Sequence, residues 1–326
     1  MHLLNRLVII FVGAAACALP ALAQAQAYPS RQIRIVVPVA PGGSTDITSR
    51  QVAERLRPVL GQTVVIDNRP GASTIIGTGL VAKAPPDGYT LLAAVAPFSA
   101  NATLFAGKLP YDTNTDFSPI LLVRVSPLVL VVNASKSIQS VQELIALAKA
   151  SPGKLNYGSS ATGGVNHLSG ELLNFMAGVN TLHISYNGEA PAATDLMGGR
   201  LDFAFSSASA VIALVNAGKL RAIGVSVRNR LSILPDVPTM DEVGLKGFQS
   251  SGWLGFVGPA GLPAAIISRL NVEVNKIIRS DEMQILFKTD GSSPGSTTPE
   301  QFTAFIREET ETWARVIKAA NITVQQ

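Results

Sequence analysis

The chain has 326 residues, of which 47% are hydrophobic and 15% are charged, and its formal net charge at pH 7 is +4. This composition is that of a globular chain with a large core, long enough for two domains, and it excludes a disordered or fibrous protein. The basic residues are spread along the sequence without interleaved aromatic residues, so we expect no nucleic-acid partner.

The first 27 residues have the pattern of a secretory signal peptide. Arg6 precedes an apolar run at residues 7–12, and small residues follow as far as the sequence Ala-Gln-Ala at positions 25–27. We therefore expect cleavage near Tyr28 and a periplasmic protein. A minor alternative is a lipid anchor at Cys17, which is the only cysteine of the sequence. A chain that starts near Tyr28 would contain no disulfide, thiol nucleophile or cysteine-ligated metal.

Short apolar runs then alternate with amphipathic helical patterns, which predicts an α/β protein with mostly parallel strands. The elements predicted before residue 140 are strands at 32–37, 63–67, 89–95 and 124–132, and helices at 44–60 and around 75–81. The helix at 44–60 has its apolar residues Val52, Leu56 and Leu60 on one stripe and is stopped by Gly61. The long apolar run at 124–132 predicts a strand that carries the chain into a second lobe.

The middle of the chain repeats the pattern of the beginning. Its predicted elements are strands at 155–157, 181–186, 201–205 and 220–227, and helices after Ser140 and at 165–177, 191–197 and 208–216. The helix after Ser140 begins with a capping box, in which Ser140 and Glu143 satisfy free N–H groups. A second crossing strand is predicted at 248–257, and helices are predicted at 262–279 and 299–320.

Two crossing strands predict two lobes joined by a hinge. The outer lobe would comprise residues 28–126 and 250–326, and the inserted lobe would comprise residues 127–249. Each lobe contains a glycine-rich loop between a strand and a helix. The loop residues expected to approach an anion are Gly42, Gly43, Ser44 and Thr45 in the outer lobe, and Ser159, Ser160, Thr162, Gly163 and Gly164 in the inserted lobe. The first N–H groups of a helix lack partners within the helix and lie at the positive end of its dipole, so such a loop allows an anion to approach them.

These two loops supply most of the candidate ligand-binding residues. The candidates are Ala40, Pro41, Gly42, Gly43, Ser44 and Asp46 in the outer lobe, and Ser159, Thr162, Gly163, Gly164, His167, Asp202 and Ser206 in the inserted lobe. Two such loops facing each other would hold a carboxylate from both sides. The alternative is that both are ordinary turns of an α/β fold. Neither loop matches a Walker A or a dinucleotide-binding motif.

Several of these residues have a structural alternative. Asp46 could hold its own loop by accepting N–H bonds at the helix N-terminus. His167 could contact the ligand or pack inside the protein. Asp202 could anchor a turn or bind a ligand donor, and the strand position of His183 favours a structural role. Ser206 and Ser207 come at the carboxyl end of a strand, where open α/β sheets bind ligands.

The sequence has no recognisable catalytic or metal-binding pattern. His167 and His183 lie in different predicted elements, and no H-E-x-x-H, G-x-S-x-G or acidic cluster occurs. We therefore expect no catalysis, no cofactor and no metal ion. The alternative is a hydrolase or transferase that uses serine and aspartate groups without a known motif.

Eight segments, taken together, indicate a family. They are residues 36–43 with Asp46, 87–92, 109–112, 116–120, 167–168 with Glu171, 186–188 with 191–192, 195–202 and 234–239. With these segments the chain resembles the substrate-binding receptors of tripartite tricarboxylate transporters, the Bug-type receptors. It departs from them at Asn187, where lysine is common, and at Ser160 and Ala161.

The resemblance implies a type II periplasmic-binding-protein fold, with two α/β lobes joined by crossing strands around a ligand cleft. It also implies a small organic carboxylate as ligand, held by the two loops and ordered water, and membrane transporter subunits as partners. We expect the receptor to be a monomer. A receptor that reports to a signalling partner instead of a transporter is the alternative.

Overall fold

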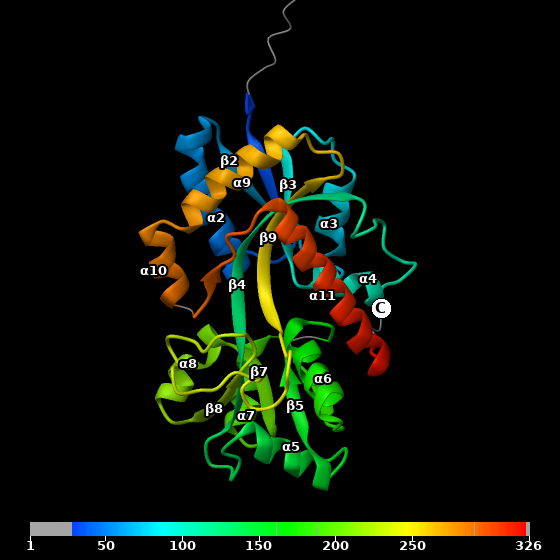
Figure 1. The fold of residues 1–326 in the computed structure, drawn as a ribbon, viewed down its shortest axis with the longest axis vertical. Helices are drawn as coiled ribbons and strands as arrows, with labels where there is room; N and C mark the ends of the chain where they lie inside the picture. Colours follow the sequence, from blue (N-terminus) through cyan, green and yellow to red (C-terminus); the bar gives the residue numbers. More distant parts are fainter. Residues whose placement is uncertain (1–27, 161, 187, 290, 324–326) are drawn as a thin grey trace, which may run out of the picture.

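The computed structural model of the protein describes residues 28–160, 162–186, 188–289 and 291–323. The predicted signal peptide, Cys17, Ala161 and Asn187 lie outside these residues. The chain forms two α/β lobes that are joined by the strands β4 and β9 (Figure 1). Within the described ranges, no helix combines the length and the apolar character needed to cross a membrane.

The outer lobe is a five-stranded sheet in the order β2-β1-β3-β9-β4. Its strands are β1 (Ile33–Val37), β2 (Val64–Asn68), β3 (Thr90–Val95), β9 (Ser251–Pro259) and the first part of β4 (Phe117–Asn133). β1 runs parallel to β2 and β3, and β9 is antiparallel to β3 and β4. The two-residue strand β10 (Ser293–Pro294) adds an antiparallel pair to β4.

Helices cover both faces of this sheet because successive side chains of a strand point to opposite sides. Ile35 belongs to a core cluster with α2 (Ser44–Leu60), α9 (Ala264–Ile278) and α10 (Asp281–Thr289). Its neighbour Val36 belongs to the cluster on the other face, with α3 (Ile75–Ala82), α4 (Pro97–Leu104) and α11 (Pro299–Ala319). α2 begins and ends at the predicted residues, whereas the sequence analysis missed α4 and α10.

β4 passes through both lobes. Its residues 117–127 pair with β9, and from Leu128 onward it pairs with β7 (Phe203–Ser207) and β8 (Leu220–Val225). The strand begins earlier than the predicted run at 124–132. The prediction began too late because Pro119 weakens the sequence signal for a strand. In the structure, Pro119 is accommodated next to a shift of register between residues 119 and 121.

The inserted lobe continues the sheet in the order β4-β7-β5-β6. β5 (Asn156–Ser159) runs parallel to β6 (Leu182–Ser185) and to β7. One face is covered by α5 (Val141–Ala150) and α6 (Val165–Ala177), and the other by α7 (Glu189–Met197) and α8 (Ala208–Asn216). At the start of α5 the Ser140 hydroxyl accepts the Glu143 N–H as predicted, but the Glu143 carboxylate accepts the N–H of Gln139 instead of Ser140.

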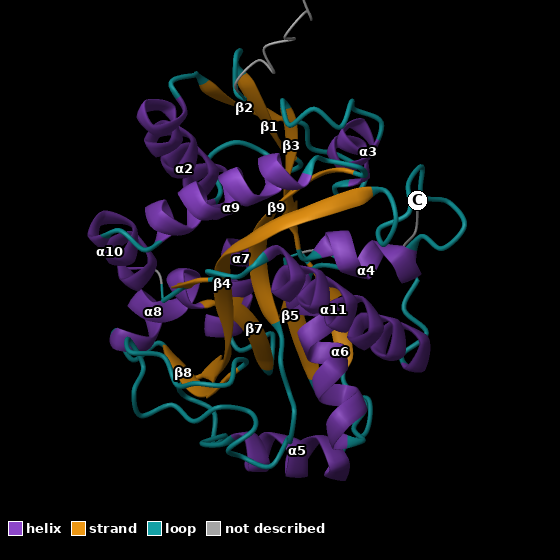
Figure 2. Ribbon diagram, turned by 45° about the horizontal axis from the view of Figure 1, so that its top comes forward, coloured by secondary structure: helices purple, strands orange, loops and turns teal. Residues whose placement is uncertain are grey.

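The C-terminal helix α11 packs against both lobes. Phe302 and Ile306 lie in the outer-lobe core, whereas Trp313, Val316 and Ile317 lie in the core of the inserted lobe. Figure 2 places α11 beside α6. A helix of 21 residues is about 30 Å long, which is enough to reach from one lobe to the other. The end of α11 therefore differs from the prediction that all of residues 250–326 form the outer lobe.

Candidate functional site

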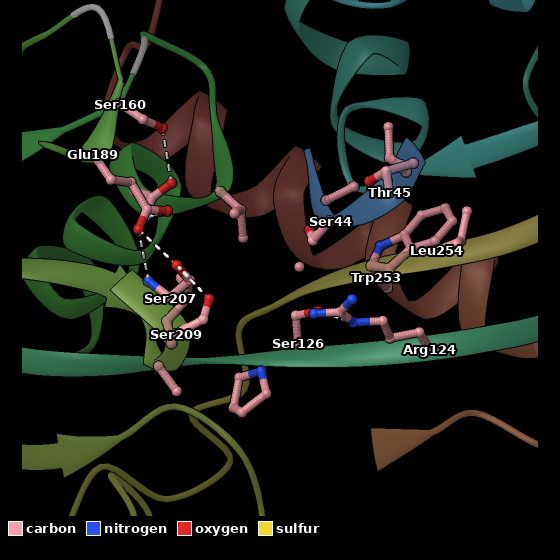
Figure 3. A pocket seen from close by; sticks show the side chains of 18 of the residues that line it. Ser44, Thr45, Arg124, Ser126, Ser160, Glu189, Ser207, Ser209, Trp253 and Leu254 are labelled. Carbon is pink, nitrogen blue, oxygen red and sulfur yellow. Dashed lines mark hydrogen bonds between the residues drawn. The ribbon is translucent and has the colours of Figure 1, made fainter. Parts of the chain in front are cut away.

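A cavity of about 380 Å³ lies between the lobes, where the chain crosses from one to the other. Its volume is in the range of sites for small organic molecules. Figure 3 places Glu189 and Ser207 of the inserted lobe on one side of it, and Ser44, Arg124 and Trp253 on the other. The lining residues are Val39, Ser44, Thr45, Val95–Pro97, Arg124, Ser126–Leu128, Ser160, Val165, Asn166, Glu189, Ser207–Ser209 and Gly252–Leu254.

Five helices begin at this cavity. Ser44 and Thr45 are the first residues of α2, Pro97 is the first of α4, and Val165 and Asn166 are the first of α6. α7 and α8 begin there as well, with Glu189 and Ala208. Because a helix N-terminus presents unpaired N–H groups and a partial positive charge, the cavity is suited to an anion.

Arg124 adds a full positive charge to the cavity wall. The residue is only 5% exposed, although it lies in an apolar strand. Its Nη1 donates to the Thr48 hydroxyl at 2.9 Å and its Nε donates to the Ser126 hydroxyl at 3.0 Å. A planar guanidinium held in this way is the group that matches a carboxylate best. Arg124 was not among the predicted site residues. The feature of the sequence that could have indicated it is a lone charge within a long apolar strand.

The first glycine loop is held in shape by Asp46. Gly42 has a φ of 89°, a left-handed conformation that favours glycine, and Gly43 is the extended N-cap of α2. The Asp46 carboxylate is buried and accepts the Gly42 N–H at 2.9 Å and the Arg50 Nε–H at 3.0 Å. It also accepts from the Asn68 amide at 3.0 Å. The hydrogen bond from Arg50, aided by those from Gly42 and Asn68, lowers the pKa of Asp46 to about 2.

The second loop has the same backbone geometry with a different chemistry. Gly163 has a φ of 77° and Gly164 is the extended N-cap of α6. The Gly163 N–H donates to Nδ1 of His167 at 3.0 Å, and the His167 ring lies 3.8 Å from that of His183. Burial, followed by the neighbouring His183, lowers the pKa of His167 to about 3, so the imidazole is neutral.

The structure brings only part of the predicted site to the cavity. Of the residues predicted on the two loops, Ser44, Thr45 and Ser160 line it. The predicted residues that are exposed on the two loops outside its wall are Ala40, Pro41, Gly42, Gly43 and Thr162, and Gly164 is half-buried. Asp46, Ser159, Gly163 and His167 are buried behind the loops, and this corrects the prediction that they contact the ligand directly.

Two further predictions on β7 are corrected. Of the two serines expected at the end of this strand, Ser207 lines the cavity and Ser206 is buried, because successive side chains of a strand face opposite sides. Asp202 precedes the amino end of β7, about 16 Å along the strand from Ser207. It forms an ion pair with Lys136 and accepts the Asn156 N–H at 2.8 Å, so it anchors the strand.

The arrangement gives the hydrolase alternative little basis. Ser159 and His183 come within 2.6 Å of each other, but Ser159 is 2% exposed and lies outside the cavity wall. Burial lowers the pKa of His183 to about 4, which makes the imidazole a weak base. Within the described part of the chain, no group of three histidine, cysteine or acidic residues could hold a metal ion.

Trp253 connects the cavity wall to the helix that packs on both lobes. Its indole N–H donates to the Glu309 carboxylate of α11 at 3.2 Å, and the Trp313 indole donates to the same oxygen at 3.0 Å. Burial raises the pKa of Glu309 to about 7 in spite of these two donors. Trp253 in the cavity wall and Trp313 of α11 are therefore linked by hydrogen bonds to one carboxyl group.

Comparison with known proteins identifies the family. Residues 48–322 match the model of the tripartite tricarboxylate transporter family receptor. The protein BugT of Bordetella pertussis is 36% identical over 320 residues, which cover 98% of both chains. A solved structure from R. palustris with adipate is 35% identical, with a TM-score of 0.77, and the match covers 91% of this chain and 99% of that one.

The periplasmic binding protein BugD gives a similar match. It is also 35% identical, its TM-score is 0.74, and the match covers 91% of this chain and 100% of the solved one. The similarity thus extends over both lobes and the strands that join them. The chain belongs to the receptor family of the tripartite tricarboxylate transporters.

Proposed function

We propose that the chain captures a small organic carboxylate in the cavity between its lobes and presents it to the membrane subunits of a tripartite transporter, without catalysing a reaction. The observation that carries this proposal is the meeting of five helix N-termini and the buried Arg124 guanidinium around one cavity. Helix N-termini and arginine both favour a carboxylate over a neutral ligand. The relative solved with adipate agrees with this chemistry.

The fold provides a way to couple binding to a change of shape. The lobes are joined by β4 and β9, and the cavity is lined from both lobes and from the crossing strands. A ligand that contacts both lobes favours the closed arrangement by its difference in affinity for the two arrangements. A membrane partner could then distinguish a loaded receptor from an empty one by its shape.

Calorimetry and thermal unfolding on the periplasmic form test the proposal. We expect a carboxylate from a panel of mono-, di- and tricarboxylates and amino acids to bind at about −8 kcal/mol or tighter and to raise the melting temperature. Arg124→Gln should weaken that binding at least about tenfold, because a charged hydrogen-bond donor is lost. Arg124→Lys, which keeps the charge, should lose less.

The matched control is Arg315→Gln, which removes a charge from the exposed face of α11. It should bind like the parent protein. Circular dichroism first establishes that each variant is folded. If a folded Arg124→Gln variant bound its carboxylate with unchanged affinity, or if only neutral sugars bound to the parent, the proposal would be wrong.

We further propose that export removes the first 27 residues and that the mature receptor is a monomer. The family match and the similarity to a periplasmic binding protein support the compartment. The intact mass of the protein from a periplasmic extract, followed by light scattering, tests both points. An acylated Cys17 or a stable dimer would contradict them.

A further inference from the structure

The two halves of the cavity wall contain ionisable side chains of opposite sign. The outer half has the Arg124 guanidinium and the N-termini of α2 and α4. The inserted-lobe half has the N-termini of α6, α7 and α8, but a carboxylate of the protein itself, that of Glu189, is already bound there (Figure 3). A ligand must be complementary to both halves.

Glu189 occupies the N-cap of α8, a donor that a ligand carboxylate would otherwise use. Its Oε2 accepts the N–H of Ser207, the N-cap of α8, at 3.1 Å and the Ser207 hydroxyl at 2.7 Å. Its Oε1 accepts from the Asn166 amide of α6 at 3.2 Å. Glu189 is itself the first residue of α7, where a negative charge is favourable. These contacts fix its carboxylate at the cavity wall.

The charge of Glu189 has no cationic partner in the part of the chain that the structure describes. Its three donors are an amide, a backbone N–H and a hydroxyl, all of them neutral. Among the described residues, no lysine, arginine or histidine forms an ion pair with it. A second ligand carboxylate near Glu189 would meet a like charge, and this is unfavourable. An ammonium group would meet an opposite charge there.

We propose that Glu189 selects small carboxylates that carry an ammonium group, with the carboxylate toward Arg124 and the ammonium toward Glu189. The inference rests on the proposed function and narrows it from carboxylates in general to amino acids. Glu189 is then the residue that determines specificity. Acceptor hydroxyls beside it, those of Ser160, Ser207 and Ser209, complete a surface suited to the remaining ammonium hydrogens.

Calorimetry with matched ligands tests this inference. The probes are α- and ω-amino acids of three to six carbons, each paired with the acid that has hydrogen in place of the amino group and with the dicarboxylate of the same length. We expect at least one amino acid to bind about tenfold or more tightly than both of its partners, because only the ammonium form pairs with Glu189.

The variant Glu189→Gln should remove most of this preference. It keeps a hydrogen-bond acceptor of the same shape but loses the charge, so the amino acid should lose about tenfold in affinity and the dicarboxylate should gain. Glu143→Gln makes the same change of charge on the exposed side of α5, in the same lobe, and should leave the ratio unchanged. The ligand preference of the parent protein remains a test if the Glu189 variant does not fold.

The possible results separate the two proposals. If carboxylates bind but the amino group gives no advantage, or if Glu189→Gln leaves the preference intact, the inference is wrong and the carboxylate receptor stands. If no carboxylate of any class binds, the proposed function fails and the inference fails with it.

Discussion

The two glycine loops have the same backbone shape but are held by opposite kinds of side chain. In each loop a left-handed glycine donates its N–H to the side chain four residues later, Gly42 to Asp46 and Gly163 to His167. Asp46 is a buried carboxylate paired with the half-exposed Arg50, and His167 is a buried neutral ring stacked on His183. The left-handed glycine before a helix N-terminus can thus be held by either a charged or a neutral hydrogen-bond acceptor.

The difference teaches how each loop responds to its environment. An acceptor with a pKa of about 2 keeps its charge over the whole physiological range, so the first loop should be insensitive to acid. A neutral imidazole holds its loop only while it stays unprotonated. The three predictions that follow test this contrast, from the largest expected effect to the smallest.

Replacing the neutral acceptor of the second loop by a carboxylate should have the largest effect on stability. His167→Asp places a carboxylate where a neutral ring stood, close to Glu171, whose Oε1 lies 3.8 Å from Nε2 of His167. A buried charge without a cation should cost about 3 to 5 kcal/mol in the free energy of unfolding, measured by urea denaturation at pH 7. His167→Asn, a neutral acceptor, is the control and should cost less. Equal stability of the two variants would show that the second loop tolerates a charge.

Acid should loosen the second loop before the first. The pKa values of His167 and His183 in the folded protein are about 3 and about 4, below that of an unfolded histidine, so the unfolded chain binds more protons as the pH falls. The stability that the two neutral histidines contribute is complete above about pH 6.5, the pKa of an unfolded histidine. It is lost as the pH falls toward their pKa values in the folded protein. Between pH 6.5 and 5 the loss should approach about 2 kcal/mol for each histidine.

Glu309 acts in the opposite direction over the same range, so the acid experiment needs a Glu309→Gln background. Its pKa is raised from 4.5 to about 7, and its stabilising contribution is therefore present below pH 4.5 and lost as the pH rises through 7. Denaturation curves from pH 5 to 7 measure the free energy of unfolding in this background. If that free energy did not change with pH, the histidines would not be buried in neutral form.

Removing the charge of the first loop should have the smallest effect. Asp46→Asn keeps the shape of the side chain but exchanges an acceptor oxygen for an NH₂ group that faces donors. We expect the free energy of unfolding at pH 7 to fall by about 2 kcal/mol, because hydrogen bonds to a charged acceptor are replaced. The loss is no larger because Arg50 stays half exposed to water. Salt should narrow the difference between variant and parent, since exposed charges are screened. A variant as stable as the parent would show that the glycine conformation needs no charged acceptor.

Local signals in the sequence determined much of the fold. The helices α2, α6 and α8 begin and end at the predicted residues, because glycine stops and apolar stripes act over a few residues. α4 carried no such signal. Its proline, serine and asparagine residues are typical of turns, and the Asn101 amide donates to the distant Ser73 carbonyl at 2.7 Å.

The site was predicted in its principle but not in its residues. Glycine loops before two helices were enough to predict anion binding between two lobes, since N–H groups at a helix N-terminus are a property of local backbone geometry. Whether a side chain beside such a loop faces the ligand or the core depends on packing. His167 and Asp46 face inward and Ser44 faces the cavity, although all three follow the same kind of loop.

Only the tertiary structure brings Arg124 and Glu189 to the wall of one cavity. They come from a crossing strand and from a helix of the inserted lobe, and the path of β4 from one sheet to the other brings them to the same space. No local pattern encodes the relation between two charges so far apart in the chain. The sequence by itself determined that an anion could bind, because that depends on helix ends. The fold decided which charged side chains line each half of the cavity, because that depends on where distant segments meet.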